Sequence, residues 1–187
     1  MSNAPDVTKS PYAIDVTAIM RKPGQMREIS LDVNVPTRLG AGVACVESGS
    51  TLEIDGRLEV LHDGILASGR ASGEMTAECV RCLDPISEPI QVDFAELFAY
   101  DLDEAYDYQI VDDTVDLEPA VRDAIVLALP FQPVCSPDCL GLDPATGNKL
   151  TEPLPEPEEQ LDPRWAALAQ FASDDTDSEK PEDRSGE

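Results

Sequence analysis

Histidine and tryptophan each occur once in this 187-residue chain, aromatic residues make up only 5% of it, and basic residues are outnumbered 13 to 38 by acidic ones. The single histidine, His62, falls at an expected hairpin turn, which is a poor position for the base of a catalytic triad. The sequence contains neither a Gly-x-x-x-x-Gly-Lys phosphate loop nor a dinucleotide-binding fingerprint. We therefore expect no enzyme activity and no small-molecule substrate.

Long apolar runs are also missing. The longest, Ala124 to Leu129, is far too short to span a bilayer, and the first dozen residues lack the basic start and apolar run of a signal peptide. We expect a cytoplasmic protein with no membrane contact. In a reducing compartment, paired cysteines favour metal binding over disulfides; extracellular disulfide bonding is the alternative.

The formal net charge of −25 is spread unevenly. Residues 1–81 carry 8 basic and 11 acidic groups, whereas no lysine or arginine lies between Arg81 and Arg122, a stretch with 12 acids. Such a protein repels phosphates and attracts basic proteins, so direct RNA binding is disfavoured. The bland alternative is that the acidity only maintains solubility. The one basic cluster, Arg21, Lys22 and Arg27, surrounds a Pro-Gly turn and is either a weak partner contact or a solvated turn.

Alternating apolar and polar residues predict several strands joined by short turns. Lys22 to Gln25 has the Pro-Gly centre of a type II turn, and Asp63-Gly64 is a hairpin signal. Residues 12–20 also alternate, although a short helix from near Asp15 is the alternative. The expected strands are 12–20, 28–35, 52–60, 65–79, 90–100 and, shorter, 108–111. Together the long strands predict an antiparallel β-meander.

One helix is expected to pack on this sheet. Asp116 is placed as the N-cap of a helix over 117–129, which Pro130 ends, and apolar residues recur at helical spacing within it. In the Gly-rich connection 36–50, Cys45 is interpreted as a small buried hydrophobic residue. The fold class is thus α+β.

The domain boundaries follow from composition. Residues 1–11 are expected to be a disordered lead-in, and residues 12–150 a single α+β domain. The acidic, Pro-rich tail, 151–187, is expected to be disordered except for a short helix at 162–172 that contains Trp165. That helix either docks on its own domain or binds a partner.

Four of the five cysteines form two short pairs, Cys79-x-x-Cys82 and Cys135-x-x-x-Cys139, separated by 52 residues. Such spacing lets two thiolates at a time reach one tetrahedral metal ion. The first pair follows a predicted strand and the second follows the helix. We therefore predict a structural zinc ion that links the end of the helix to the sheet edge. Four free thiols, or one true pair with two bystanders, are the alternatives.

Four stretches of the chain resemble the bacterial YceD family, described as large ribosomal RNA subunit accumulation proteins. The stretches span roughly residues 14–142, and their order and spacing are more specific than any one of them. They are Arg21-Lys22-Pro23-Gly24, Glu78-Cys79-Val80-Arg81-Cys82-Leu83, Asp116-Leu117-Glu118-Pro119 with Val121-Arg122-Asp123, and Leu129-Pro130 leading into Cys135 and Cys139. Members of this family that resemble the chain often carry further cysteines past the position of Cys139, whereas Thr146 stands here where another cysteine would be expected. The departure leaves the four paired cysteines as the ligand set.

The resemblance implies a β-rich α+β fold and a role in the synthesis, processing or stability of large-subunit ribosomal RNA. It brings no catalytic residue. We expect a non-enzymatic ribosome biogenesis factor whose partner is a large ribosomal subunit precursor or a basic ribosomal protein. The alternative is an acidic protein–protein adaptor or regulator unrelated to the ribosome.

Overall fold

The computed structural model describes residues 10–101 and 107–154. The chain divides into two units, 1–151 and 152–187, and the fold described below is that of the first. Most of the predicted lead-in, and the predicted tail helix at 162–172 with Trp165, lie outside the described residues.

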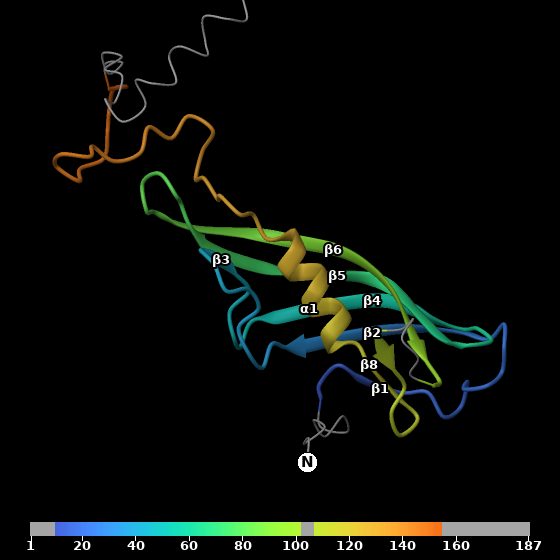
Figure 1. Ribbon diagram of the computed structural model, residues 1–187. Coiled ribbons are helices and arrows are strands. Elements are labelled where there is room, and N and C mark those ends of the chain that lie inside the picture. Colours follow the sequence, from blue (N-terminus) through green and yellow to red (C-terminus); the bar gives the residue numbers. More distant parts are fainter. Residues whose placement is uncertain (1–9, 102–106, 155–187) are drawn as a thin grey trace, which may run out of the picture. The chain divides into compact units, whose positions relative to one another are not determined.

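A long antiparallel sheet dominates the first unit (Figure 1). Its strand order is β2-β4-β5-β6-β7, with β3 beside β5, and β7 is the one parallel neighbour among the described strands. A separate pair joins β1 to β8, and α1 crosses one face of the sheet. The elements are β1 (Ala13–Asp15), β2 (Met26–Asn34), β3 (Ala44–Cys45), β4 (Thr51–Val60), β5 (Gly64–Glu78), β6 (Pro85–Ala99), β7 (Tyr108–Gln109), β8 (Thr114–Asp116) and α1 (Glu118–Ala128).

The predicted meander is confirmed in β2, β4, β5 and β6. Along β4 the alternation has the expected result, because Leu52 and Leu58 are fully buried while Glu53 and the other intervening polar side chains are mostly exposed. The hairpin between β4 and β5 closes where Leu61 N–H donates to the Gly64 carbonyl at 2.8 Å. β5 and β6 then pair along all 15 residues of each strand.

Two predicted strand boundaries are wrong by five residues each. β6 begins at Pro85 instead of residue 90, because β6 has no neighbour on its outer side along most of its length and so tolerates prolines. The strand predicted over 12–20 ends at Asp15. Beyond it the chain turns, since the N–H groups of Ile19 and Met20 both donate to the Val16 carbonyl.

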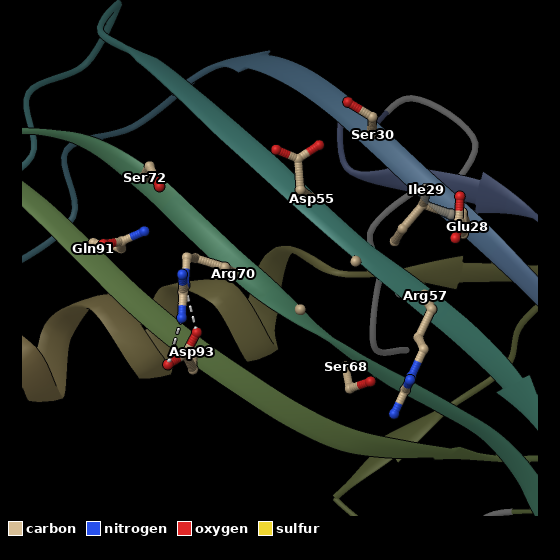
Figure 2. Close-up of a pocket in the computed structure, with 12 residues that line it drawn as sticks. Glu28, Ile29, Ser30, Asp55, Arg57, Ser68, Arg70, Ser72, Gln91 and Asp93 are labelled. Atoms are coloured by element: carbon tan, nitrogen blue, oxygen red, sulfur yellow. Dashed lines mark hydrogen bonds and ion pairs between the residues drawn. The ribbon is translucent and has the colours of Figure 1, made fainter.

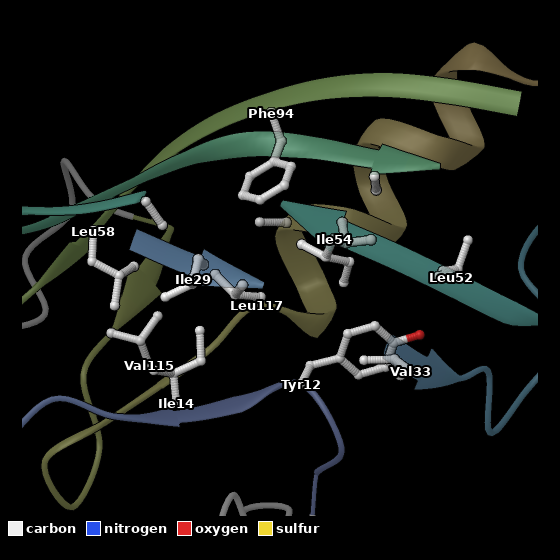
Figure 3. Packing of buried hydrophobic residues seen from close by; sticks show 14 of the residues in the cluster. Tyr12, Ile14, Ile29, Val33, Leu52, Ile54, Leu58, Phe94, Val115 and Leu117 are labelled. Carbon is white, nitrogen blue, oxygen red and sulfur yellow. The ribbon is translucent and has the colours of Figure 1, made fainter. Parts of the chain in front are cut away.

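α1 packs on the sheet as predicted, with Val121 and Ile125 buried in the main core. It begins at Glu118, one residue later than expected, and Leu117 occupies the N-cap position without a side-chain cap. Asp116 still supports the first turn, because its carboxylate accepts a hydrogen bond from the Glu118 N–H at 3.0 Å. Apolar side chains of β1 and β8 meet those of the sheet in the same core (Figure 3).

Gly56 and Gly69 face each other across β4 and β5. A Cβ atom on either glycine would lie 2.5 Å from a carbonyl oxygen of the neighbouring strand, so the two strands approach more closely than side chains would allow.

Among the described residues we find no helix with the length and hydrophobicity needed to cross a bilayer.

Candidate metal centre

The four paired cysteines come together at one end of the sheet. Cys79 directly follows β5 and Cys82 lies in the turn before β6, whereas Cys135 and Cys139 belong to the segment after α1. Their four Sγ atoms all lie within 4.8 Å of one another. The Sγ atoms of Cys79 and Cys139 are 3.9 Å apart, and those of Cys82 and Cys135 are 3.6 Å apart. The predicted juxtaposition of the two pairs is thus present.

These distances suit a tetrahedral metal site. Four sulfurs bound at about 2.3 Å to one zinc ion would be separated from one another by about 3.8 Å. The two closest sulfur pairs, at 3.6 and 3.9 Å, lie on either side of that value. A disulfide requires a sulfur–sulfur distance of about 2.05 Å, and all five cysteines are free. The donor set therefore fits a metal ion bound by four thiolates.

Two tight turns aim the sulfurs. In the first, Leu83 N–H donates to the Cys79 carbonyl at 2.8 Å, and Leu83 adopts a φ of 62°, which lets the chain turn back directly after the pair. In the second, Cys139 N–H donates to the Ser136 carbonyl at 3.1 Å, and Asp138 N–H donates to the Ser136 hydroxyl. Each turn presents its two sulfurs toward the other turn.

Within the first cysteine pair the protein favours the thiolate of Cys79 over that of Cys82. The backbone N–H of Cys135, assisted by those of Cys82 and Arg81, outweighs burial and lowers the pKa of Cys79 to about 6. A backbone hydrogen bond from Asp84 favours the Cys82 thiolate, but burial and the three neighbouring sulfurs outweigh it and raise the pKa of Cys82 to about 12. A bound divalent cation would override this preference, because its charge stabilises all four thiolates together.

Side chains other than the cysteines link the first turn to the segment after α1. The Arg81 guanidinium donates to the carbonyl of Pro137 at 3.1 Å and to that of Cys139 at 2.9 Å. Lys149 forms an ion pair with Asp84 at 2.6 Å. Sequence reasoning missed these contacts. The one available signal was the position of Arg81 inside the Cys-x-x-Cys motif.

The cysteines rest on a small apolar cluster separate from the main core. Ala44, Ala77, Cys79, Cys82 and Ile86 form this cluster, and four partly buried hydrophobic residues pack against it. These four are Leu129, Val134, Cys139 and Leu142. The segment 131–150 therefore has little apolar anchoring of its own. A metal ion bound by the four cysteines would add a strong attachment of this segment to the end of the sheet.

The family model described as large ribosomal RNA subunit accumulation protein YceD matches residues 67–172, which include all four clustered cysteines. The chain belongs to the YceD family. An uncharacterized protein of Mycobacterium tuberculosis is 38% identical over 177 residues, which cover 90% of this chain and 85% of the relative. A second, from Mycobacterium leprae, is 34% identical and covers 89% and 80% of the two chains. Uncharacterized protein YlbN of Bacillus subtilis is 28% identical, covering 80% and 88%. No solved structure matches the chain.

The basic cluster of this YceD-family chain lies at the turn before β2. The turn has the predicted type, since Gly24 adopts a φ of 84° and Gln25 N–H donates to the carbonyl of Lys22. Lys22 Nζ and an Arg27 guanidinium nitrogen donate to backbone carbonyls of the preceding segment, at 2.7 and 2.8 Å. The Arg21 backbone N–H donates to a tyrosine hydroxyl of the segment after β6. Two of the three cationic side chains thus bind their own backbone.

The sheet face opposite α1 has an open hollow of about 880 Å³ (Figure 2). Gly56 and Gly69 lie in its floor, and polar side chains of β2, β4, β5 and β6 line it. Arg70 of β5 and Asp93 of the neighbouring β6 form an ion pair at 2.7 Å on one side of it (Figure 2). A neighbouring hollow of about 480 Å³ is lined by three glutamates, Glu53, Glu74 and Glu88. This face of the YceD-family domain is polar and mainly acidic.

Proposed function

We propose that this chain is a non-enzymatic factor that supports the synthesis, processing or stability of large-subunit ribosomal RNA by binding the assembling large subunit. The family match carries the proposal, because the family is named for accumulation of that RNA. The proposed direct partner is a basic ribosomal protein.

The charge of the chain supports a protein partner over naked RNA. At a net charge of −25 the molecule repels phosphates at long range and attracts cationic surfaces. The hollow lined by Glu53, Glu74 and Glu88 agrees with this preference. Two of the three side chains in the basic cluster are held by backbone carbonyls.

The proposed role of the cysteine cluster is to hold a structural zinc ion. Thiolates are ligands that zinc prefers, and four of them leave no coordination position for a substrate. The ion would fix the segment after α1 against the end of β5. We therefore assign it to the architecture of the protein and to no chemical step.

Gradient sedimentation tests the proposed function. Full-length tagged protein, expressed at its native level, should co-sediment with large-subunit precursors, and its depletion should lower large-subunit relative to small-subunit ribosomal RNA. Absence from the precursor fractions would contradict the proposal and favour an adaptor unrelated to the ribosome. In a second assay, purified protein should bind protein-free ribosomal RNA only weakly at physiological salt. Tight, sequence-selective RNA binding would refute the electrostatic argument.

A further inference from the structure

An apolar hollow of about 370 Å³ lies between the connection before β3 and the end of α1. Residues 40–44 form one wall, and Val126 with residues 129–131 forms the other. Several of its large side chains face solvent: Phe131 is 91% exposed and Val43 is 45% exposed. Contiguous exposed apolar surface of this kind marks an interaction site more often than an isolated side chain does.

A second hollow, of about 420 Å³, adjoins the first and shares Gly42 and Val43 with it. Its lining combines small apolar residues with one cationic side chain, Arg38, and two carboxylates, Glu47 and Glu78. Arg38 lies 3.7 Å from the Glu47 carboxylate, whereas Glu78 has no ion-pair partner within the described residues. An apolar socket therefore lies beside the carboxylate of Glu78, for which the described part of the chain supplies no ion-pair partner.

We infer that these two hollows form one docking groove for a basic segment of a protein partner. An apolar side chain of that segment fills the socket beside Phe131, and a lysine or arginine next to it lies against Glu78. Charge selects this occupant, because the net charge of −25 disfavours acidic segments, nucleic acid and a second copy of this chain. The inference rests on the proposed function and adds to it the surface that the ribosomal protein meets.

The cysteine cluster lies next to both sides of this docking groove. Glu78 immediately precedes Cys79, so one side of the groove is continuous with the first cysteine pair. Phe131 lies four residues before Cys135 on the other side. Leu129, which lines the socket, packs against the small apolar cluster that contains the first two cysteines. A metal ion at the cysteines would fix the two walls relative to each other without touching the partner.

Site-specific crosslinking tests the groove directly. A photoreactive benzophenone amino acid at position 131 of the full-length chain is exposed to proteins extracted from purified large ribosomal subunits. We expect a crosslink to a lysine- and arginine-rich protein. The same photoreactive group at position 26 is the matched control, because Met26 is 63% exposed at the start of β2 and lines neither hollow. It should not give that product.

Binding measurements on variants complete the test. Phe131→Ser should weaken binding to the crosslinked protein at least about tenfold, as expected for an aromatic anchor in a socket. Glu78→Lys should weaken it severalfold, with the loss diminishing as salt is raised. Met26→Ser should bind like wild type. Because the Phe131 side chain is so exposed, Phe131→Ser should have the melting temperature of the wild type, and this measurement separates lost binding from lost folding.

The outcomes separate a failure of the proposed docking groove from a failure of the proposed function. If the wild type sediments with large-subunit precursors and Phe131→Ser does so equally, the groove is refuted while the proposed function stands. If the wild type does not sediment with them, both fall together. A crosslink from position 131 to RNA, to an acidic protein or to a second copy of the chain would overturn the partner chemistry.

Discussion

Removal of the proposed zinc ion should loosen one end of this protein and leave the rest folded. A ligand that binds only the folded state, at a free concentration a thousandfold above its Kd, stabilises it by about 4 kcal/mol. In a unit of 151 residues, each kcal/mol corresponds to roughly 2–4 °C in Tm, so chelation should lower Tm by about 8–16 °C. The large core of β2, β4, β5, β6 and α1 does not include the cysteines, and it should remain intact.

Hydrogen exchange locates the effect. On chelation, or in Cys82→Ser, the N–H groups of Cys139 and Leu150, which are bonded within the segment 131–150, should lose protection, whereas the amides of β4 and β5 should keep theirs. Elemental analysis should give about one zinc per wild-type chain. Cys45→Ser is the matched control, because Cys45 is buried outside the cluster and bonds to Glu47. A metal-free wild type with unchanged Tm and unchanged exchange would refute the structural role of the cluster.

Three further predictions concern single side chains. Gly141→Ala should weaken metal retention more than Gly147→Ala, as measured by competition with a chromophoric chelator. Both glycines have positive φ, but only at Gly141 would the new Cβ lie 3.0 Å from a carbonyl oxygen of the first cysteine turn. Equal losses would contradict the clash. Ile125→Ala should cost about 2–5 kcal/mol of unfolding free energy in urea, while Leu127→Ala, which is 87% exposed, should change it by no more than about 0.5 kcal/mol. Burial, then the Glu118 carboxylate, raises the pKa of Tyr12 to about 12, so stability present below pH 10 should fall as the pH rises toward 12. The fall should be smaller in Tyr12→Phe, and an equally steep one would exclude Tyr12 as its source.

Sequence alone predicted the long strands because each carries its own signal. In β4 the residues at alternate positions are apolar and buried except at Gly56, and the Asp-Gly turn after the strand fixes the hairpin. β3 and β8 escaped prediction because two or three residues cannot show an alternation. Their pairing is decided by distant partners, as in Ala44 with Ala77 and Ile14 with Val115.

The candidate metal centre likewise has a part that the sequence predicted and a part that it did not. Cysteine spacing predicted which sulfurs would meet, because a metal restricts the ligand geometry strongly. The ion pair of Lys149 with Asp84 joins residues 65 positions apart and has no local sequence pattern. The docking groove was also invisible, since its walls come from segments before β3 and after α1, and exposure of Phe131 is a property of the fold.

The pairing of β1 with β8 has a consequence for the newly made chain. Ala13 finds its partner at Asp116, so the first strand emerges from the ribosome long before the strand that it needs. At about 5–20 residues per second, the wait is roughly 5–20 s. During that time the apolar side chains that β1 and β8 later help to cover, Ile29 and Val33 among them, lack part of their final shielding. Native structure should therefore form late in translation, and a nascent chain stalled before residue 116 should need protection from aggregation.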